Sequence, residues 1–236
     1  MQEKLKKGLL CLIDPDKEIK FLKEMVKKIS DAGASAILLG GSTYGEVDFD
    51  EFVKEVKRYS EIPVIIFPSG IHHVSKYADA IFFMSLLSGR NPQYLIEEQV
   101  KAAPLIKKYG LEVIPVGYIL VDGGNPTSAS YISHTMPIPR DKPRIAKYHA
   151  LTAQYFGMKY VYLDAGSGAK YSVPEEMIKE VKEYIDIPLI VGGGIKTPEE
   201  ALEKRKAGAD FIVVGNIIEK DINLVYEFVK VLEKEG

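Results

Sequence analysis

Short apolar runs alternate with longer amphipathic stretches along the whole chain. Eight runs are of strand type, at residues 8–13, 36–39, 64–67, 80–84, 112–120, 160–163, 189–191 and 211–214. Most gaps between them carry a helical pattern, at residues 18–31, 49–59, 93–109, 142–156, 174–184 and 198–206. Strands that alternate with helices predict a parallel sheet, and eight such units predict a (β/α)8 TIM barrel of the α/β class.

The third of these connections is shorter than the others. Residues 64–84 contain two predicted strands, and only residues 71–77 are left between them for a helical segment. A strand, a crossover helix and a parallel return strand need more room than this. The sequence therefore predicts a modified TIM barrel in which the third crossover helix is abbreviated to a turn or loop.

Internal similarity supports the barrel. Residues 32–41 run Ala-Gly-Ala, an apolar strand and Gly-Gly, and they resemble residues 207–216, which run Ala-Gly-Ala, an apolar strand and Gly-Asn. In both segments the first glycine suits the left-handed position that follows a helix. The 236 residues are enough for one barrel of about 250 residues, and no linker-like stretch interrupts them. We therefore expect a single domain over residues 1–236.

Composition and charge limit the partners and the cellular location expected for such a barrel. The formal net charge of −2 argues against nucleic acid as a partner, because a phosphate backbone requires a basic face. The apolar run at residues 9–13 is too short for a signal peptide or a membrane span, so we expect a cytoplasmic protein. Cys11 is the only cysteine, and its place in a predicted strand indicates a buried thiol rather than a nucleophile.

One segment is too polar and irregular to form barrel wall. It covers residues 121–139 and contains Gly-Gly-Asn-Pro and Met-Pro-Ile-Pro. A loop of this length in a compact domain is usually functional or disordered. Because it follows the fifth predicted strand, it opens on the face where barrel active sites form.

Glycine-bearing turns follow the last three predicted strands. They lie at residues 165–168, 192–194 and 215–216. Glycine lets backbone amides approach an anion closely, and turns after strands seven and eight form the usual phosphate site of a TIM barrel. Backbone relief alone is the alternative explanation for any one of them. The three turns together favour a site for a phosphate ester.

Polar side chains stand at the predicted carboxyl ends of three strands. Asp14 ends strand one, Ser42 and Thr43 end strand two, and Asp164 ends strand six. A carboxylate and a hydroxyl from adjacent strands suit Mg²⁺, which binds oxygen ligands and often shares substrate phosphate. Without further information, Asp14 could equally be a turn residue or helix cap instead of a metal ligand. Ser42 or Thr43 could equally be a simple turn residue. Four histidines lack zinc-type spacing and are interpreted as structural or solvated: His72, His73, His134 and His149.

The order of these features matches one enzyme family along nearly the whole chain. The matching segments are Leu12-Ile13-Asp14-Pro15, Leu39-Gly40-Gly41-Ser42, Phe82-Phe83-Met84-Ser85-Leu86-Leu87 with Asn91-Pro92, Pro115-Val116-Gly117-Tyr118-Ile119, Tyr162-Leu163-Asp164-Ala165-Gly166-Ser167-Gly168, Val191-Gly192-Gly193-Gly194-Ile195 and Gly215-Asn216. The third and fifth of these segments are not general barrel motifs. The chain therefore resembles the geranylgeranylglyceryl phosphate synthases, and it is more similar to their archaeal-type branch than to the bacterial heptaprenyl branch.

The resemblance implies a prenyltransferase. Such an enzyme joins sn-glycerol 1-phosphate to geranylgeranyl diphosphate, releases diphosphate and forms the first ether bond of archaeal-type membrane lipids. The family has a modified TIM barrel, uses Mg²⁺ and forms homo-oligomers, which are dimers or hexamers. An amphiphilic product is also compatible with transient membrane contact, without an anchor in this chain.

The resemblance also implies roles for individual positions. Asp14 and Ser42 would bind the metal. The residues that would embrace the glycerol are Tyr162, Leu163, Asp164, Ala165, Gly166, Ser167 and Gly168. The residues that would hold its phosphate are Gly193, Gly194, Gly215 and Asn216. Many members have glutamate where this chain has Asp164, so the role of Asp164 as the catalytic base requires the shorter acid to reach the glycerol hydroxyl. The prenyl tail needs an apolar groove, with predicted walls at Tyr94, Tyr118 and Tyr131.

Two alternatives share parts of this pattern. Another phosphate-binding barrel enzyme, such as a sugar-phosphate isomerase or synthase, would share the glycine turns. Such enzymes place a lysine or a second acid at other strand ends, whereas strand three here ends in Phe67-Pro68-Ser69 and strand four in Met84-Ser85. A noncatalytic scaffold would keep the barrel but would not need Asp14, Ser42 and Asp164 together.

Overall fold

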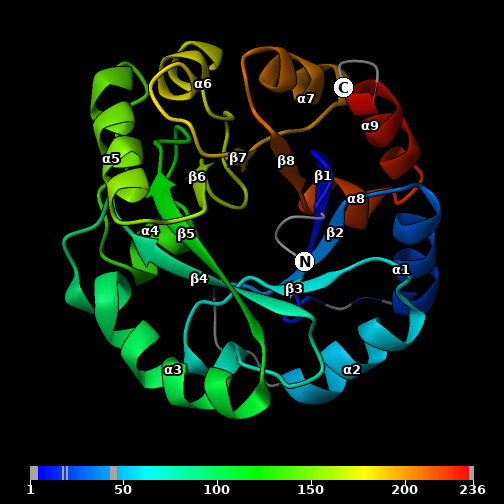
Figure 1. The fold of residues 1–236 in the computed structure, drawn as a ribbon. Helices are drawn as coiled ribbons and strands as arrows, with labels where there is room; N and C mark the ends of the chain where they lie inside the picture. Colours follow the sequence, from blue (N-terminus) through cyan, green and yellow to red (C-terminus); the bar gives the residue numbers. More distant parts are fainter. Residues whose placement is uncertain (1–4, 18, 20, 43–46, 234–236) are drawn as a thin grey trace.

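Eight parallel strands close into a barrel in the computed structural model, which describes residues 5–17, 19, 21–42 and 47–233 (Figure 1). The strands are β1 (Gly8–Ile13), β2 (Ala36–Leu39), β3 (Val64–Ile66), β4 (Ala80–Leu86), β5 (Glu112–Leu120), β6 (Tyr160–Asp164), β7 (Leu189–Gly192) and β8 (Phe211–Val214). Each strand pairs with the next along the chain, and β1 closes the barrel on β8. The predicted barrel is confirmed. Thr43 lies outside the described residues.

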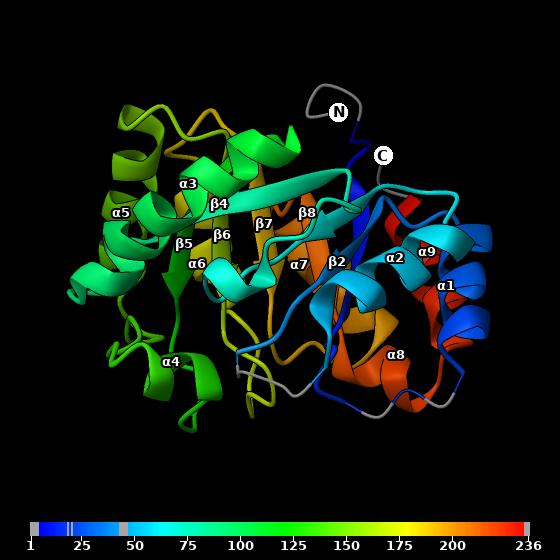
Figure 2. The same ribbon diagram turned by 90° about the horizontal axis from the view of Figure 1, so that it is seen from below.

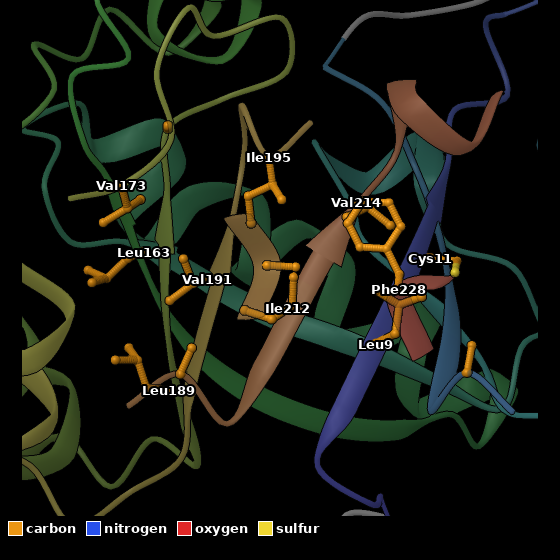
Figure 3. Packing of buried hydrophobic residues seen from close by; sticks show 14 of the residues in the cluster. Leu9, Cys11, Leu163, Val173, Leu189, Val191, Ile195, Ile212, Val214 and Phe228 are labelled. Atoms are coloured by element: carbon orange, nitrogen blue, oxygen red, sulfur yellow. The ribbon is translucent and has the colours of Figure 1, made fainter. Parts of the chain in front are cut away.

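Alternate side chains of the strands fill two separate layers. Inward-facing residues such as Leu10, Phe82 and Tyr162 pack inside the barrel. Their outward-facing neighbours, such as Cys11 and Leu163, pack between the barrel and the helices. Figure 3 shows part of this outer layer, with side chains from β1, β7 and β8. Both layers are buried, which explains why the strands are continuous apolar runs without polar alternation.

The helices form the outer ring of the molecule (Figure 1). They are α1 (Leu22–Asp31), α2 (Phe49–Tyr59), α3 (Glu98–Tyr109), α4 (Ser128–Ile132), α5 (Pro143–Tyr155), α6 (Glu175–Lys182), α7 (Pro198–Lys206), α8 (Asn216–Lys220) and α9 (Leu224–Glu233). The six predicted helices are present, although α1 and α3 begin later than expected. A π-helical turn, Gln93–Glu97, precedes α3. None of the helices within the described residues is long and apolar enough to cross a membrane.

Three helices were not expected from the sequence. The segment at residues 121–139 contains α4, which Thr127 begins by accepting a hydrogen bond from the Ser130 amide. In Figure 2, α4 lies beyond the carboxyl end of β5. After β8 the chain forms α8 and then α9, whose buried residues face the barrel. The prediction that residues 121–139 form an irregular loop was therefore only partly correct.

The abbreviated third crossover is confirmed. Between β3 and β4 the helical content is one 3₁₀ turn, Ile71–His73. Every other pair of neighbouring strands from β1 to β8 is joined by at least one α-helix. The outer face of β3 and β4 is consequently covered from the side by α3, where Ile81 packs with Ala102 and Ile106.

A buried carboxylate ties the amino-terminal ends of three strands together. Asp210, just before β8, accepts hydrogen bonds from the Lys182 side chain at 2.6 Å and from the Leu189 amide at 2.9 Å. It also pairs with Lys7 at 2.6 Å, next to the start of β1. Burial opposes ionisation, but the bonds from Lys182 and Lys7 outweigh it and lower the pKa of Asp210. Asp210 is therefore charged in the folded protein.

We expect Asp210→Asn to lower the free energy of unfolding by about 2 kcal/mol, because the buried side chain loses the negative charge that strengthens its bonds to Lys182, Lys7 and the Leu189 amide. A lowered carboxyl pKa contributes stability that is fully present above the ordinary carboxyl pKa and is lost as the pH falls through the folded value. The difference in free energy of unfolding between the variant and the unsubstituted protein should therefore decrease as the pH falls. Urea unfolding at several pH values measures this, with the exposed Asp31→Asn as control. A deficit that does not change with pH would contradict the assignment.

Candidate active site

A cavity of about 470 Å³ opens at the carboxyl ends of the strands, and we call it the polar cavity because charged side chains and glycine turns line it. Ten of the sequence-predicted site residues line it: Asp14, Ser42, Tyr162, Asp164, Ser167, Gly168, Gly193, Gly194, Gly215 and Asn216. Because the strands are parallel and closed, residues more than 200 positions apart in the chain meet at one mouth. The cavity is large enough for a small phosphate ester.

Three other predicted residues lie behind this surface. The side chain of Leu163 packs in the outer layer, as Figure 3 shows, and Ala165 is buried in the same layer. Gly166 turns the chain and donates its backbone N–H to Asp164 at 2.8 Å. These residues shape the turn after β6 but do not line the cavity with their side chains.

Asp164 is a buried carboxylate with two hydrogen-bond donors. One oxygen, Oδ2, accepts the Tyr118 hydroxyl at 2.6 Å, and the other, Oδ1, accepts the Gly166 amide. Burial raises the pKa of Asp164, and these two bonds act in the opposite direction. The result is a carboxyl group with a higher proton affinity than a solvated one, as general-base catalysis requires.

Tyr118 was predicted only as a wall of the prenyl groove. The barrel register pairs Tyr118 of β5 with Tyr162 of β6, so both side chains point inward beside Asp164. Burial raises the pKa of the Tyr118 hydroxyl well above its usual value, and Asp164 adds to this effect. Tyr118 therefore stays protonated and donates its hydrogen bond. The sequence carries no signal for this contact, because it depends on the register between β5 and β6.

The glycine turn after β7 packs directly against Asp164. Gly193 has a backbone φ of +77°, and a Cβ there would lie 2.4 Å from Asp164 Oδ1. A side chain at this position would collide with the carboxylate. Across the mouth, Asn216 Oδ1 accepts the Lys17 ammonium at 2.6 Å and the Ser167 hydroxyl at 3.3 Å, which fixes the amide plane.

Charge around the cavity is asymmetric. Among the described residues, four ammonium-bearing side chains line its β6 to β1 side: Lys17, Lys170, Lys196 and Lys220. The Lys17 ammonium lies 2.6 Å from Glu219, and Lys196 donates to the Lys170 carbonyl. An excess of positive charge beside glycine turns favours an anion.

Asp14 and Ser42 lie at the ends of adjacent strands, as predicted. A Cβ on Gly41 would lie 2.5 Å from Asp14 Oδ1, so the carboxylate is packed against the backbone that leads to Ser42. Burial raises the pKa of Asp14, while the Asp16 amide and the Lys17 charge lower it. Within the described residues no cluster of three or more His, Cys, Asp or Glu side chains forms a metal cage. The oxygen donors fit a Mg²⁺ ion that takes its remaining ligands from water and substrate.

An apolar groove adjoins the polar cavity. Its floor and sides come from the segment between β3 and β4, from β4 and β5, and from α3 and α4, with residues such as Val74, Ile81, Phe83, Ala102 and Ile106. Within the part of the chain that the structure describes, the two share five residues: Gly41, Ser42, Phe67, Tyr118 and Ala129. The abbreviated third crossover leaves this space beside β3 and β4.

Two of the three predicted groove tyrosines line the groove. These are Tyr94 and Tyr118. The third prediction, Tyr131, was wrong, because its side chain is 78% exposed. In α4 the residues Ala129 and Ile132 face the groove, and the helix turn between them carries Tyr131 outward.

Comparison with known proteins identifies the family. The PcrB family model matches residues 2–232. A geranylgeranylglyceryl phosphate synthase of Chitinophaga pinensis is 48% identical over 222 residues, which cover 94% of this chain and 88% of that protein. The protein of the same name from Pyrococcus horikoshii is 47% identical over 224 residues, covering 93% and 87%.

Solved structures agree with this relationship. The (S)-3-O-geranylgeranylglyceryl phosphate synthase of Thermoplasma acidophilum, in complex with sn-glycerol-1-phosphate, superposes with a TM-score of 0.90 at 38% identity, covering 99% of this chain and 95% of that one. Thiamine phosphate pyrophosphorylase of Pyrococcus furiosus superposes with a TM-score of 0.65 at 19% identity, covering 99% of this chain and 98% of that one. This likeness shows the fold alone. The chain belongs to the PcrB family, among the geranylgeranylglyceryl phosphate synthases.

Proposed function

We propose that this chain joins sn-glycerol 1-phosphate to geranylgeranyl diphosphate, giving geranylgeranylglyceryl phosphate and diphosphate. The observation that carries the proposal is the meeting of two unlike cavities at shared residues. One is lined by glycine turns and by charged side chains such as Asp14, Asp164 and Lys17, and the other is a mainly apolar groove. A reaction between a small phosphate ester and a long hydrocarbon donor needs both. Family membership supports the same reaction.

The glycerol phosphate would occupy the polar cavity. We assign its phosphate to Gly193, Gly194, Gly215 and Asn216, where backbone amides and the oriented Asn216 amide supply donors. The nearby lysines favour the doubly charged phosphate. Tyr162, Ser167 and Gly168 would contact the glycerol. Fixing the nucleophile by its phosphate leaves its far hydroxyl over Asp164, which contributes to the rate through proximity and orientation.

Asp164 would act as the general base. The 3-hydroxyl of the glycerol donates to the carboxylate and loses its proton to it as the new carbon–oxygen bond forms. The buried position excludes water, and the hydrogen bond from Tyr118 holds the carboxylate in one orientation. A base whose pKa is raised toward the working pH accepts the proton more effectively.

Asp14 and Ser42 would hold the Mg²⁺ ion on the side of the cavity nearest the groove. When bound there, Mg²⁺ would neutralise the charge that develops on the departing diphosphate. Ser42 lines both cavities, so this side is where the diphosphate and the prenyl tail would join. Asp14 and Ser42 would therefore set the position of the leaving group.

The prenyl tail would lie in the apolar groove. Each methylene that leaves water contributes about 0.8 kcal/mol, so a long donor gains affinity with every buried isoprene unit. The inner end of the groove lies between β4 and α3, where Ala102 is 7% exposed. A larger side chain in place of Ala102 would reduce the space at this end of the groove.

We also propose a homo-oligomer, either a dimer or a hexamer. Large apolar side chains are exposed along α5 and just after it: Ile145, Tyr148, Tyr155 and Phe156. A contiguous apolar helix face of this kind is typical of a subunit interface. Transient contact with a membrane during product release is compatible with the same proposal.

Purified protein with Mg²⁺, sn-glycerol 1-phosphate and geranylgeranyl diphosphate is expected to form the ether product and release diphosphate. Chromatography of the lipid fraction measures this. The 3-phosphate enantiomer and addition of EDTA should each abolish product. Failure with every prenyl diphosphate, together with binding of a different phosphate ester, would instead support a sugar-phosphate enzyme.

Tyr118→Phe is expected to lower kcat roughly tenfold, because Asp164 loses the donor that orients it. The lost hydrogen bond also lowered the pKa of Asp164, so its removal raises that pKa. The acid limb of the kcat profile should therefore move to higher pH. Tyr226→Phe, at an exposed position of α9, is the matched control. An unchanged pH profile would argue against Asp164 as the base.

Ala102→Phe is expected to shorten the groove and change donor preference. The value of kcat/KM should fall about tenfold with the 20-carbon donor and change little with a 10-carbon donor. The control Val100→Phe lies on the same helix at a position that is 62% exposed. Equal losses with both donors would place the tail elsewhere.

A further inference from the structure

Three aromatic rings gather where the polar cavity meets the groove. Phe67 lies 5.8 Å from Tyr118 and 5.7 Å from Tyr162, measured between ring centroids. The two tyrosine rings are 5.4 Å apart. Phe67 and Tyr118 line both the cavity and the groove, and Tyr162 lines the cavity. Phe67 and Tyr118 therefore lie at the junction of the two cavities, and the Tyr162 ring packs directly beside them.

The barrel places these rings together from strands that are not all neighbours. Tyr118 and Tyr162 are register partners on β5 and β6. Phe67 follows β3, and its amide donates to the Leu39 carbonyl of β2 at 2.8 Å. Its ring reaches across the mouth to the two tyrosines and remains half-buried, so part of its surface faces the cavities. An apolar core position would instead bury the ring completely.

The chemistry at this junction creates a positive charge, on the basis of the function proposed above. The allylic carbon–oxygen bond of the donor breaks, and its electron pair leaves with the diphosphate oxygen. The remaining cation is shared between two allylic carbons. A lone pair of the glycerol 3-hydroxyl then forms the new carbon–oxygen bond, and the hydroxyl proton passes to the Asp164 carboxylate. Every atom and charge is accounted for by the two substrates and this acid.

A transient carbocation in this position needs stabilisation by a group that does not react with it. A carboxylate or water would capture the cation, whereas the face of an aromatic ring attracts a cation through its quadrupole without forming a bond. Among the described residues that border both cavities, Phe67 and Tyr118 are the only aromatic ones. The Tyr118 hydroxyl is already engaged with Asp164.

We propose that Phe67 is a catalytic residue whose ring face stabilises the allylic cation, with Tyr118 and Tyr162 holding that ring in place. The three rings also exclude water from the reacting carbon. Phe67 then lowers the free energy of the transition state more than it strengthens binding of the donor, because the charge that it stabilises is absent from the bound donor.

Graded fluorination of Phe67 tests this proposal. Each added fluorine withdraws electron density from the ring face and leaves its shape nearly unchanged. Protein is prepared with phenylalanine, 4-fluoro-, 3,5-difluoro- or 3,4,5-trifluorophenylalanine at position 67, and the single-turnover rate of ether formation is measured. The rate should fall stepwise, by roughly tenfold in total, while KM for both substrates stays constant. The same series at Phe228, a buried residue of α9 that lies outside the lining of both cavities, is the control, and the rate should not change along it.

Conventional variants provide a second measurement. Phe67→Tyr keeps a ring and should retain most of the rate, whereas Phe67→Leu fills much of the same space and should lose it. A flat fluorination series at position 67 in an enzyme that makes the ether product would overturn this inference alone. An unsubstituted protein that makes no ether product would overturn the proposed function and this inference with it.

Discussion

The hydrogen bond between Tyr118 and Asp164 is the interaction on which the proposed chemistry depends. An ionised carboxylate at this depth is unfavourable unless donors surround it. Tyr118 and the Gly166 amide supply those donors, and Gly193 leaves the carboxylate room. The arrangement keeps Asp164 chargeable and oriented, with a pKa raised by burial. The turns after β6 and β7 therefore position the proposed catalytic base as well as form part of the proposed phosphate site.

A second constraint comes from the missing third crossover helix. A complete helix between β3 and β4 would fill the space that the apolar groove occupies. The single 3₁₀ turn leaves β4 and α3 as groove walls and brings Phe67 to the edge of the polar cavity. The same local shortening thus supplies the room for a hydrocarbon tail and the aromatic surface beside the reacting carbon. The phosphate-binding half of the barrel keeps the ordinary arrangement of the fold.

The barrel could be predicted from the sequence because its strands are buried on both faces and appear as continuous apolar runs. The helix α9 was missed although Val225, Phe228 and Leu232 repeat at helical spacing, whereas α4 is too short for such a repeat to be visible. Strand-end residues such as Asp14 and Asp164 were predictable as neighbours, since parallel strands bring their carboxyl ends together. The Tyr118 bond to Asp164 was not, because it depends on strand register. The prediction that Tyr131 lines the groove was wrong, because the position of a residue within the single turn of α4 decides whether it faces the groove or solvent.

A crystal structure with sn-glycerol 1-phosphate, Mg²⁺ and an unreactive thio-analogue of the prenyl diphosphate would show whether the two cavities hold the two substrates. We expect the phosphate on the turns at Gly193 and Gly215, and the 3-hydroxyl within hydrogen-bond distance of Asp164. We also expect the first allylic carbon between that hydroxyl and Phe67, with the tail in the groove. A glycerol bound with its hydroxyls turned away from Asp164, or a tail outside the groove, would rule out the proposed roles of Asp164 and the groove.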